Sequence, residues 1–349
     1  MRYCLSLVCS LVLTGLPASP VAAAEPLRLY TWEGYFSDTL LQRWAKAHSP
    51  VQEIHFDSSD VRDATLARGD ADLDLVVINE VSATRLGQDG LLTRIDPQRL
   101  PHLSELDPRW RQSCGDYAVP YVWGTLGLLY RSDRLARAPS SWQPLLQPEP
   151  ALHGHIAMLE DHDDLLVAPL ITLGAAINSD DPELLRRSFT LLKAQAPAVL
   201  TYQYVVSALH NPAYSDRIEL ALGYSGDQHL LNAATPGQPW RFVTPREGSL
   251  LWVDCVALLS SSRHQAAAWR FIDFLNEPRN AVLATEDLHL ATPNAGALRL
   301  LSADLRQDPS LFPPDEVLAR SQVFREGPPD TFQTRQRIGS ALVGRHDAQ

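Results

Sequence analysis

The organisation of this chain is decided by the stretch Tyr117–Tyr130, which reads YAVPYVWGTLGLLY. It is long, carries no charge and is rich in aromatic and β-branched residues, which favour a strand. Pro120, Gly124 and Gly127 interrupt it at points where backbone angles can change. We therefore expect this segment to cross from one lobe of the protein to another.

The length of the chain supports a division into two lobes. Residues 25–349 exceed what one hydrophobic core usually serves. Because no Pro- or Ser-rich linker separates two contiguous halves, the chain is expected to cross between the lobes more than once. The predicted lobe 1 comprises residues 25–129 and 254–298, and the predicted lobe 2 comprises residues 130–253 and 299–349.

Strand and helix patterns alternate near the start of the mature chain, which predicts an open α/β sheet. The predicted elements are a strand at Leu27–Tyr30, a helix from Ser37 to His48, a strand at Asp74–Ile78 and an amphipathic stretch at Val81–Gly87. Ligands bind at the carboxyl ends of strands in such sheets. Thr31–Tyr35 and Asn79–Val81 follow strands directly and are therefore expected at a binding crevice.

Four more elements are predicted further along the chain. They are a helix capped by Asp181, strands at Ile218–Tyr224 and Leu250–Leu259, and a helix at Ala266–Leu275.

Residues 1–24 have the features of a signal peptide. Arg2 precedes an apolar run from Leu5 to Leu16, and Ala22-Ala23-Ala24 supplies small residues for cleavage before Glu25. No later run approaches the ~20 apolar residues that span a bilayer. The sequence therefore predicts an exported, soluble, periplasmic protein.

The mature chain is acidic. Arg2 is the one charged residue in the leader, so residues 25–349 carry 29 basic and 41 acidic side chains. Nucleic-acid binding rests on Lys and Arg that neutralise phosphates, so this class is excluded. A negative field instead suits a cationic ligand.

Cys114 and Cys255 are the two cysteines of the mature chain. In an oxidising compartment they can form a disulfide between distant segments. The alternative, two buried free thiols that act as small hydrophobic side chains, is equally compatible with the sequence.

Aromatic residues stand beside carboxylates at several predicted strand ends. Trp32-Glu33-Gly34-Tyr35 follows the first strand, and alternation places Trp252 and Asp254 on one face of a later strand. An acidic run covers Glu160–Asp164, and Tyr224 precedes Ser225, Gly226 and Asp227. Aromatic rings attract an organic ammonium group, and carboxylates accept charge-assisted hydrogen bonds from it.

Two other kinds of site were weighed. His153, His155 and His162 beside Asp161 are potential zinc ligands. Paired carboxylates can also serve as acid and base, but the sequence contains no nucleophile elbow, phosphate loop or zinc-protease motif. We predict no metal, no cofactor and no enzymatic activity.

Over its whole mature length the chain resembles the spermidine/putrescine-binding proteins of bacterial ABC importers. The resemblance is carried by Leu29–Trp32, Leu73–Val77, Gly90–Pro97, Asp116–Gly124, Pro245–Asp254 and Ala291–Asn294. It implies a two-lobed α/β fold of the type II periplasmic-binding class, with crossover hinge strands and a ligand held between the lobes.

The resemblance also implies ligand-binding residues. Most of these residues match aromatic, polar or acidic positions of the family, and Glu33 and Glu80 are acids beside such positions. The predicted set is Trp32, Glu33, Tyr35, Asn79, Glu80, Asp161, Asp164, Tyr224, Trp252 and Asp254. Several positions depart from the family pattern. Gly34 replaces an acidic residue, Glu80 a small polar residue and Leu290 a tyrosine.

The predicted function is capture of a polyamine or a similar organic cation by a monomer that delivers it to an ABC permease. The alternative is a polyamine-sensing subunit that signals to a membrane-bound cyclic-di-nucleotide enzyme.

Overall fold

The computed structural model describes residues 25–56, 58–69, 72–325 and 327–347, so the predicted signal peptide lies outside the described residues. One curled sheet runs through this part of the chain in the order β2-β1-β3-β9-β4-β7-β5-β6, with β10 beside β9 and β8 beside β4. Its strands are β1 (Leu27–Thr31), β2 (Val51–His55), β3 (Leu75–Asn79), β4 (Ala118–Arg131), β5 (Ile156–Ala157), β6 (Val199–Thr201), β7 (Leu220–Tyr224), β8 (Trp240–Val243), β9 (Leu250–Leu258) and β10 (Gln322–Val323).

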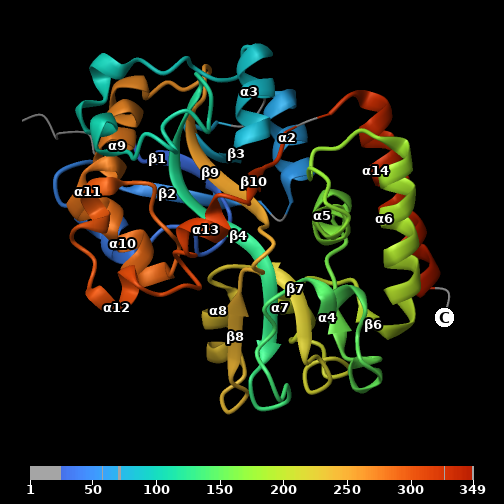
Figure 1. Cartoon of the computed structure of the whole chain (residues 1–349). Helices are drawn as coiled ribbons and strands as arrows, with labels where there is room; N and C mark the ends of the chain where they lie inside the picture. The colour runs from blue at the N-terminus through green and yellow to red at the C-terminus, as the bar shows by residue number, and fades with distance from the viewer. Residues whose placement is uncertain (1–24, 57, 70–71, 326, 348–349) are drawn as a thin grey trace, which may run out of the picture.

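Helices cover the two parts of the sheet, as Figure 1 shows. They are α1 (Asp38–Ala45), α2 (Ser59–Arg68), α3 (Glu80–Gln88), α4 (Gln143–Leu146), α5 (His162–Thr172), α6 (Pro182–Gln195), α7 (Val205–Ala208), α8 (Asp227–Ala234), α9 (Gln265–Asn276), α10 (Pro278–Leu288), α11 (Ala295–Leu298), α12 (Ala303–Arg306), α13 (Asp315–Leu318) and α14 (Pro329–Asp347). None of the helices in the described part of the chain is long and apolar enough to cross a membrane.

Strand β4 is the crossing that the sequence predicts. Its first part, up to Thr125, pairs antiparallel with β9, and its second part, from Leu126, pairs with β7. Gly124 and Gly127 do not break the strand, although its register shifts between Pro120 and Val122. In Figure 1 the strand runs continuously from the upper to the lower part of the molecule.

Separate hydrophobic clusters lie on the two sides of this crossing, and we call them lobe 1 and lobe 2. Lobe 1 packs around β1, β3, the first part of β4 and α9. Lobe 2 packs around the second part of β4, α5 and β7. The predicted lobe boundaries remain predictions. Leu301 and Phe312 pack with lobe 1, whereas Phe324 and Ile338 pack with lobe 2. This packing favours a last crossing of the chain near residue 323.

Lobe 1 begins with the predicted α/β order. Strand β1 is parallel to both β2 and β3, and α1, α2 and α3 each follow one of these strands. Ser37 caps α1 by accepting from the amide of Leu40. The helix predicted to reach His48 ends at Ala45, because the amides of Ala47 and His48 both turn back to the carbonyl of Trp44.

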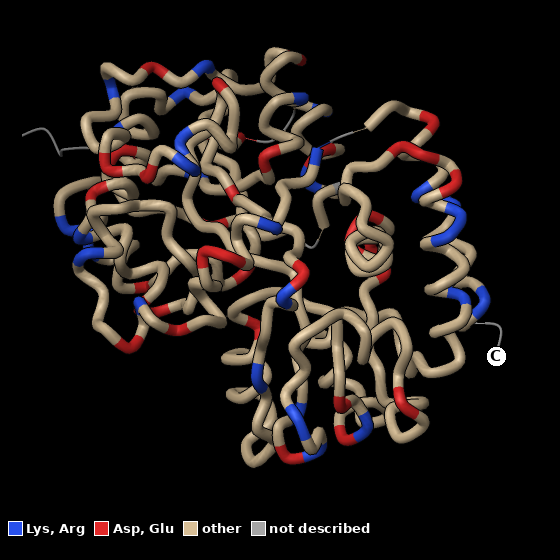
Figure 2. The backbone as a smooth tube through the Cα atoms, in the orientation of Figure 1, with Lys and Arg blue, Asp and Glu red and all other residues tan. Residues whose placement is uncertain are grey.

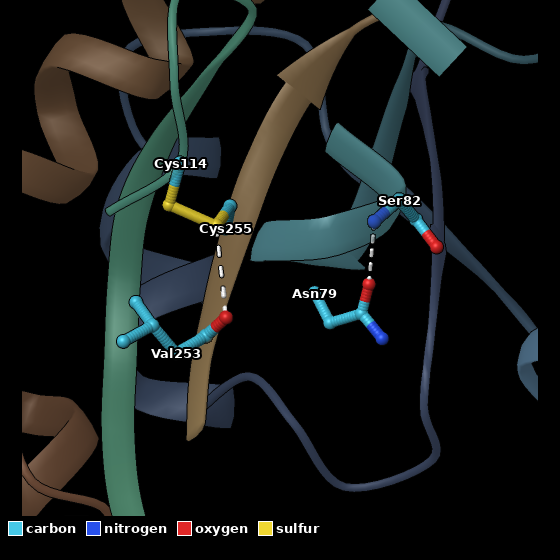
Figure 3. Close-up of a disulfide and its surroundings, with 5 residues drawn as sticks. All are labelled: Asn79, Ser82, Cys114, Val253 and Cys255. Carbon is cyan, nitrogen blue, oxygen red and sulfur yellow. Dashed lines mark hydrogen bonds between the residues drawn. A yellow bond between two sulfur atoms is a disulfide. The ribbon is translucent and has the colours of Figure 1, made fainter. Parts of the chain in front are cut away.

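The pairing of the two cysteines, which the sequence left open, is decided by the structure. Cys114 and Cys255 form a disulfide with Cα atoms 6.1 Å apart. Both residues are fully buried in lobe 1, so the bond ties the loop before β4 to the middle of β9 (Figure 3).

Charged residues are spread over both lobes, and acidic and basic segments are interspersed in Figure 2. Strand β4 is uncharged until Arg131, its last residue.

Candidate functional site

The segment after β1 brings two aromatic side chains to the carboxyl end of the sheet in lobe 1. Trp32 packs edge-on against Phe56, with ring centroids 4.4 Å apart. The hydroxyl of Tyr35 donates a hydrogen bond to the carboxylate of Asp254. Glu33 is exposed and has no hydrogen bond or ion pair within the described residues.

Strand β9 supplies the second pair of side chains. Trp252 and Asp254 are half-buried, whereas Val253 and Cys255 between and after them are fully buried. This alternation confirms the prediction that Trp252 and Asp254 share a face. The Trp252 ring lies over Gly124 of the neighbouring strand β4. Any larger residue there would displace the ring, because a Cβ on Gly124 would lie 2.2 Å from it.

The end of β3 places Asn79 and Glu80 beside Asp254. Asn79 is the partner of Asp254 in the β3–β9 ladder, and its side chain caps α3 by accepting from the amide of Ser82 at 2.8 Å (Figure 3). Glu80, the first residue of α3, is buried, and its Oε2 atom has no hydrogen-bond partner. Burial raises the pKa of Glu80 to about 8, and the charge of Asp254 adds to this effect.

Lobe 2 contributes a carboxylate that already has a partner. Asp164, in the first turn of α5, is buried and accepts a hydrogen bond of 2.5 Å from the hydroxyl of Tyr224. Asp161 is exposed and caps the same helix by accepting from the amides of Asp163 and Asp164. Its role in ligand binding stays a prediction, because helix capping by itself explains why an acid stands there.

Two residues outside the predicted set complete the lobe 2 side. Asp227 is buried, accepts from the Tyr204 hydroxyl at 2.5 Å and from the amide of Tyr224 at 2.8 Å. Asp227 stood in the sequence as a polar residue after a strand end, whereas Tyr204 lies in a loop and carries no local signal. Their role is visible only through their contacts with Tyr224.

These two sets of residues meet between the lobes. The rings of Trp252 and Tyr224 lie edge to face with centroids 6.3 Å apart. Burial raises the pKa of Asp164, and the charges of Asp161, Asp163 and, least of all, Glu80 of lobe 1 add to this effect.

Burial shifts the other carboxyl groups of the junction as well. It raises the pKa of Asp254 to about 6, against the opposing effects of the Tyr35 hydrogen bond and the charge of Arg62. It raises the pKa of Asp227 to about 7. For both acids burial outweighs the opposing interactions, and an ammonium group beside them would favour their charged forms.

Arg62 is the positive group that acts on Asp254. Its guanidinium is buried, donates to Asp63 and to the hydroxyl of Ser82, and lies over the ring of Phe56. These contacts tie α2 to the first turn of α3, which carries Glu80.

The residues that the structure describes contain no group of three or more His, Cys, Asp or Glu side chains that could hold a metal ion. His153, His155, His162 and Asp161 thus form no such group, and the zinc alternative is not supported. His155 instead contacts the carbonyl of Arg217.

Residues 45–313 match the family described as bacterial extracellular solute-binding protein. The chain belongs to this family. The resemblance inferred from the sequence is thereby confirmed at the level of the family, whose members bind solutes.

Two curated relatives extend over nearly the whole chain. A norspermidine sensor from Vibrio cholerae is 32% identical over 94% of this chain and 91% of its own length. The spermidine/putrescine-binding periplasmic protein of Escherichia coli is 26% identical over 88% of this chain and 89% of its own length.

Solved structures confirm the fold. A spermidine/putrescine ABC transporter substrate-binding protein from Streptococcus pneumoniae, in complex with calcium and HEPES, superposes with a TM-score of 0.81 at 22% identity, covering 93% of this chain and 100% of that one. A putative spermidine/putrescine ABC transporter from Listeria monocytogenes gives a TM-score of 0.78 at 23% identity, covering 91% and 98%. The predicted two-lobed α/β fold with a crossing strand is therefore correct.

Proposed function

We propose that this protein binds a polyamine or a similar organic cation between its lobes and makes no chemical change to it. One observation supports this most directly: aromatic rings and buried carboxyl groups from both lobes meet at the junction, where Trp252 lies against Tyr224 and the Tyr224 hydroxyl bonds to the buried Asp164. The names of the two relatives agree with this ligand class.

The chemistry of the junction fits an alkylammonium ligand. The ring faces attract the cation, and carboxylates accept its charged hydrogen bonds. Without the rings, an ion pair would barely offset the cost of removing both charges from water. Because both lobes contribute groups, the ligand stabilises the arrangement in which they face each other.

The predicted ligand-binding residues remain a proposal, and the structure supports them unequally. Tyr35, Glu80, Asp164, Tyr224, Trp252 and Asp254 form the connected group described above. Trp32 and Asn79 lie beside it, and Glu33 and Asp161 are exposed at its edge.

We further propose that the protein is exported through its leader and acts in the periplasm as a monomer. The Escherichia coli relative is periplasmic by name. An ABC permease is the first partner proposed, because the two solved neighbours are named as spermidine/putrescine ABC transporter proteins. The acidic surface gives no reason to expect nucleic acid.

A sensing role is the second candidate. The observation that favours it is the similarity to the norspermidine sensor, which is 32% identical over 91% of its length, against 26% for the spermidine/putrescine-binding periplasmic protein. In this role the ligand-bound form would be recognised by a membrane-bound cyclic-di-nucleotide enzyme instead of a permease.

Ligand binding is tested by thermal shift, because a ligand that binds the folded state raises the melting temperature. The protein should respond to at least one of putrescine, cadaverine, spermidine, norspermidine, spermine and agmatine. A flat response to all six would refute polyamine binding. A pull-down of the native protein with its membrane partner would then decide between the two roles, according to whether a permease or a sensor is recovered.

A further inference from the structure

We propose that Glu80 recognises an internal ammonium group, so that the site selects linear triamines or longer polyamines over diamines of the same length. This inference rests on the proposed function and names the ligand class within it.

The position of Glu80 is fixed by secondary structure. It is the first residue of α3 and directly follows Asn79, whose backbone pairs with that of Asp254 in the sheet. The side chain of Glu80 is 8% exposed. A buried side chain at the start of a helix that is anchored by a cap and by Arg62 has little freedom to leave the junction.

The charge of Glu80 is coupled to carboxyl groups of both lobes. On its own lobe it interacts with Asp254, whose charge raises the pKa of Glu80. On the other side it interacts with Asp164 of lobe 2, whose pKa is raised in part by Glu80. The antiparallel pairing of Asn79 with Asp254 directs Glu80 toward Trp252, the part of β9 that contacts Tyr224 of lobe 2. Asp254, Glu80 and Asp164 thus supply three carboxyl groups, the number of cationic nitrogens in a linear triamine.

Glu80 differs from Asp254 and Asp164 in that no side chain in the described part of the chain donates a hydrogen bond to it. Asp254 accepts from the Tyr35 hydroxyl, and Asp164 accepts from the Tyr224 hydroxyl. The Oε2 atom of Glu80 is buried and has no partner among the described residues. Because nearly all buried polar atoms in proteins are hydrogen-bonded, an unpartnered carboxyl oxygen at a binding site points to a donor that arrives with the ligand.

A proton takes the place of that donor in the ligand-free protein. Burial and the charge of Asp254 raise the pKa of Glu80 to about 8, so the group is protonated at pH 7. A secondary ammonium group would favour the carboxylate, and the proton would pass to the buffer on binding. A ligand with a methylene group at this point would leave the proton in place.

The experiment compares norspermidine with 1,7-diaminoheptane, which has the same chain length but a methylene group in place of the central nitrogen. Affinities are measured by isothermal titration calorimetry on the wild type, on Glu80→Gln and on Glu316→Gln, whose exposed acid lies on α13. We expect the wild type and Glu316→Gln to prefer the triamine by roughly tenfold or more, the scale of one charged hydrogen bond. Glu80→Gln should reduce this preference to within about threefold while the diamine affinity is retained.

A second readout does not depend on affinity. Titrations in buffers of different ionisation enthalpy count the protons released, and at pH 7 Glu80→Gln should release about one proton fewer than the wild type on binding norspermidine. An unchanged triamine preference in a folded Glu80→Gln variant, or unchanged proton release, would overturn the inference. Failure of the wild type to bind either amine would instead overturn the proposed function on which it rests.

Discussion

The two halves of the candidate site differ in how their polar groups are satisfied. In lobe 1 the Oε2 atom of Glu80 and the indole nitrogen of Trp252 are buried without partners. In lobe 2 Asp164 and Asp227 each accept hydrogen bonds from tyrosine hydroxyls. Asp254 of lobe 1 also accepts from a tyrosine hydroxyl, so the difference lies in Glu80 and Trp252, whose unpartnered atoms a ligand would satisfy.

The lobes also differ in their covalent structure. The disulfide lies wholly within lobe 1 and fixes β9, the strand that carries Trp252 and Asp254. None of the residues that pack in lobe 2 is a cysteine. The disulfide therefore restrains the strand that carries the lobe 1 side of the site, and lobe 2 has no such restraint among these packed residues.

The largest expected effect comes from removing this cross-link. In the mature chain, Cys114→Ser with Cys255→Ser should lower the free energy of unfolding by about 2–5 kcal/mol, because the unfolded chain regains the entropy that the bond removes. Urea denaturation without reductant measures the change. Wild type with reductant should behave like the double variant, and an unchanged unfolding midpoint would show that the disulfide does not stabilise lobe 1.

The next effect concerns the charged acceptor of lobe 1. Asp254→Asn should weaken polyamine binding by about 1.5–3 kcal/mol, the range for a hydrogen bond to a charged group. Calorimetry measures the affinity, and circular dichroism checks the fold. Unchanged affinity would show that Asp254 does not contact the ligand. Lobe 1 would then lack the charged acceptor assigned to it in the comparison with lobe 2.

The pH dependence of the melting temperature tests how much the burial of Asp254 and Glu80 costs in the ligand-free protein. The folded chain raises the pKa of Asp254 to about 6 and that of Glu80 to about 8, so it favours their protonated forms. Their contribution to stability is complete below their ordinary pKa values and is lost as the pH rises through about 6 and then about 8. Between pH 5 and 8.5 the melting temperature of the ligand-free wild type should therefore fall more steeply than that of Glu80→Gln. Parallel curves would show that Glu80 does not titrate in this range.

The smallest effect is expected at the edge of lobe 2. Asp161→Asn should change stability by no more than about 0.5 kcal/mol, because asparagine caps a helix as well as aspartate does. Its exposed side chain should also contribute far less to amine affinity than Asp254 does. A loss of affinity as large as that of Asp254→Asn would make lobe 2 an equal source of binding free energy.

Much of the fold was predictable from local patterns. The crossing strand, the caps at Ser37 and Asp181 and the shared face of Trp252 and Asp254 were all found where the sequence placed them. These features depend on residues within a few positions of one another. The length of the first helix was overestimated, because a turn back to the carbonyl of Trp44 ends it.

The candidate site was predictable in part. Residues that share a face of one strand, or that directly follow a strand, were identified from spacing and from family resemblance. Asp227 stood in the motif after Tyr224 but was not included in the predicted set, and Tyr204 was missed. Tyr204 acts through its hydrogen bond to Asp227, 23 residues away, and such a contact leaves no periodic signal in the sequence.

The sequence by itself determined the elements, the acidic character and the aromatic and acidic residues available for an organic cation, since these follow from composition and short-range periodicity. The tertiary structure decided that the two cysteines pair, that Asp164 is held by Tyr224 and that the Oε2 atom of Glu80 is left without a hydrogen-bond partner. The reason is physical: burial and hydrogen bonding depend on which distant segments meet, and this is settled only when the lobes pack.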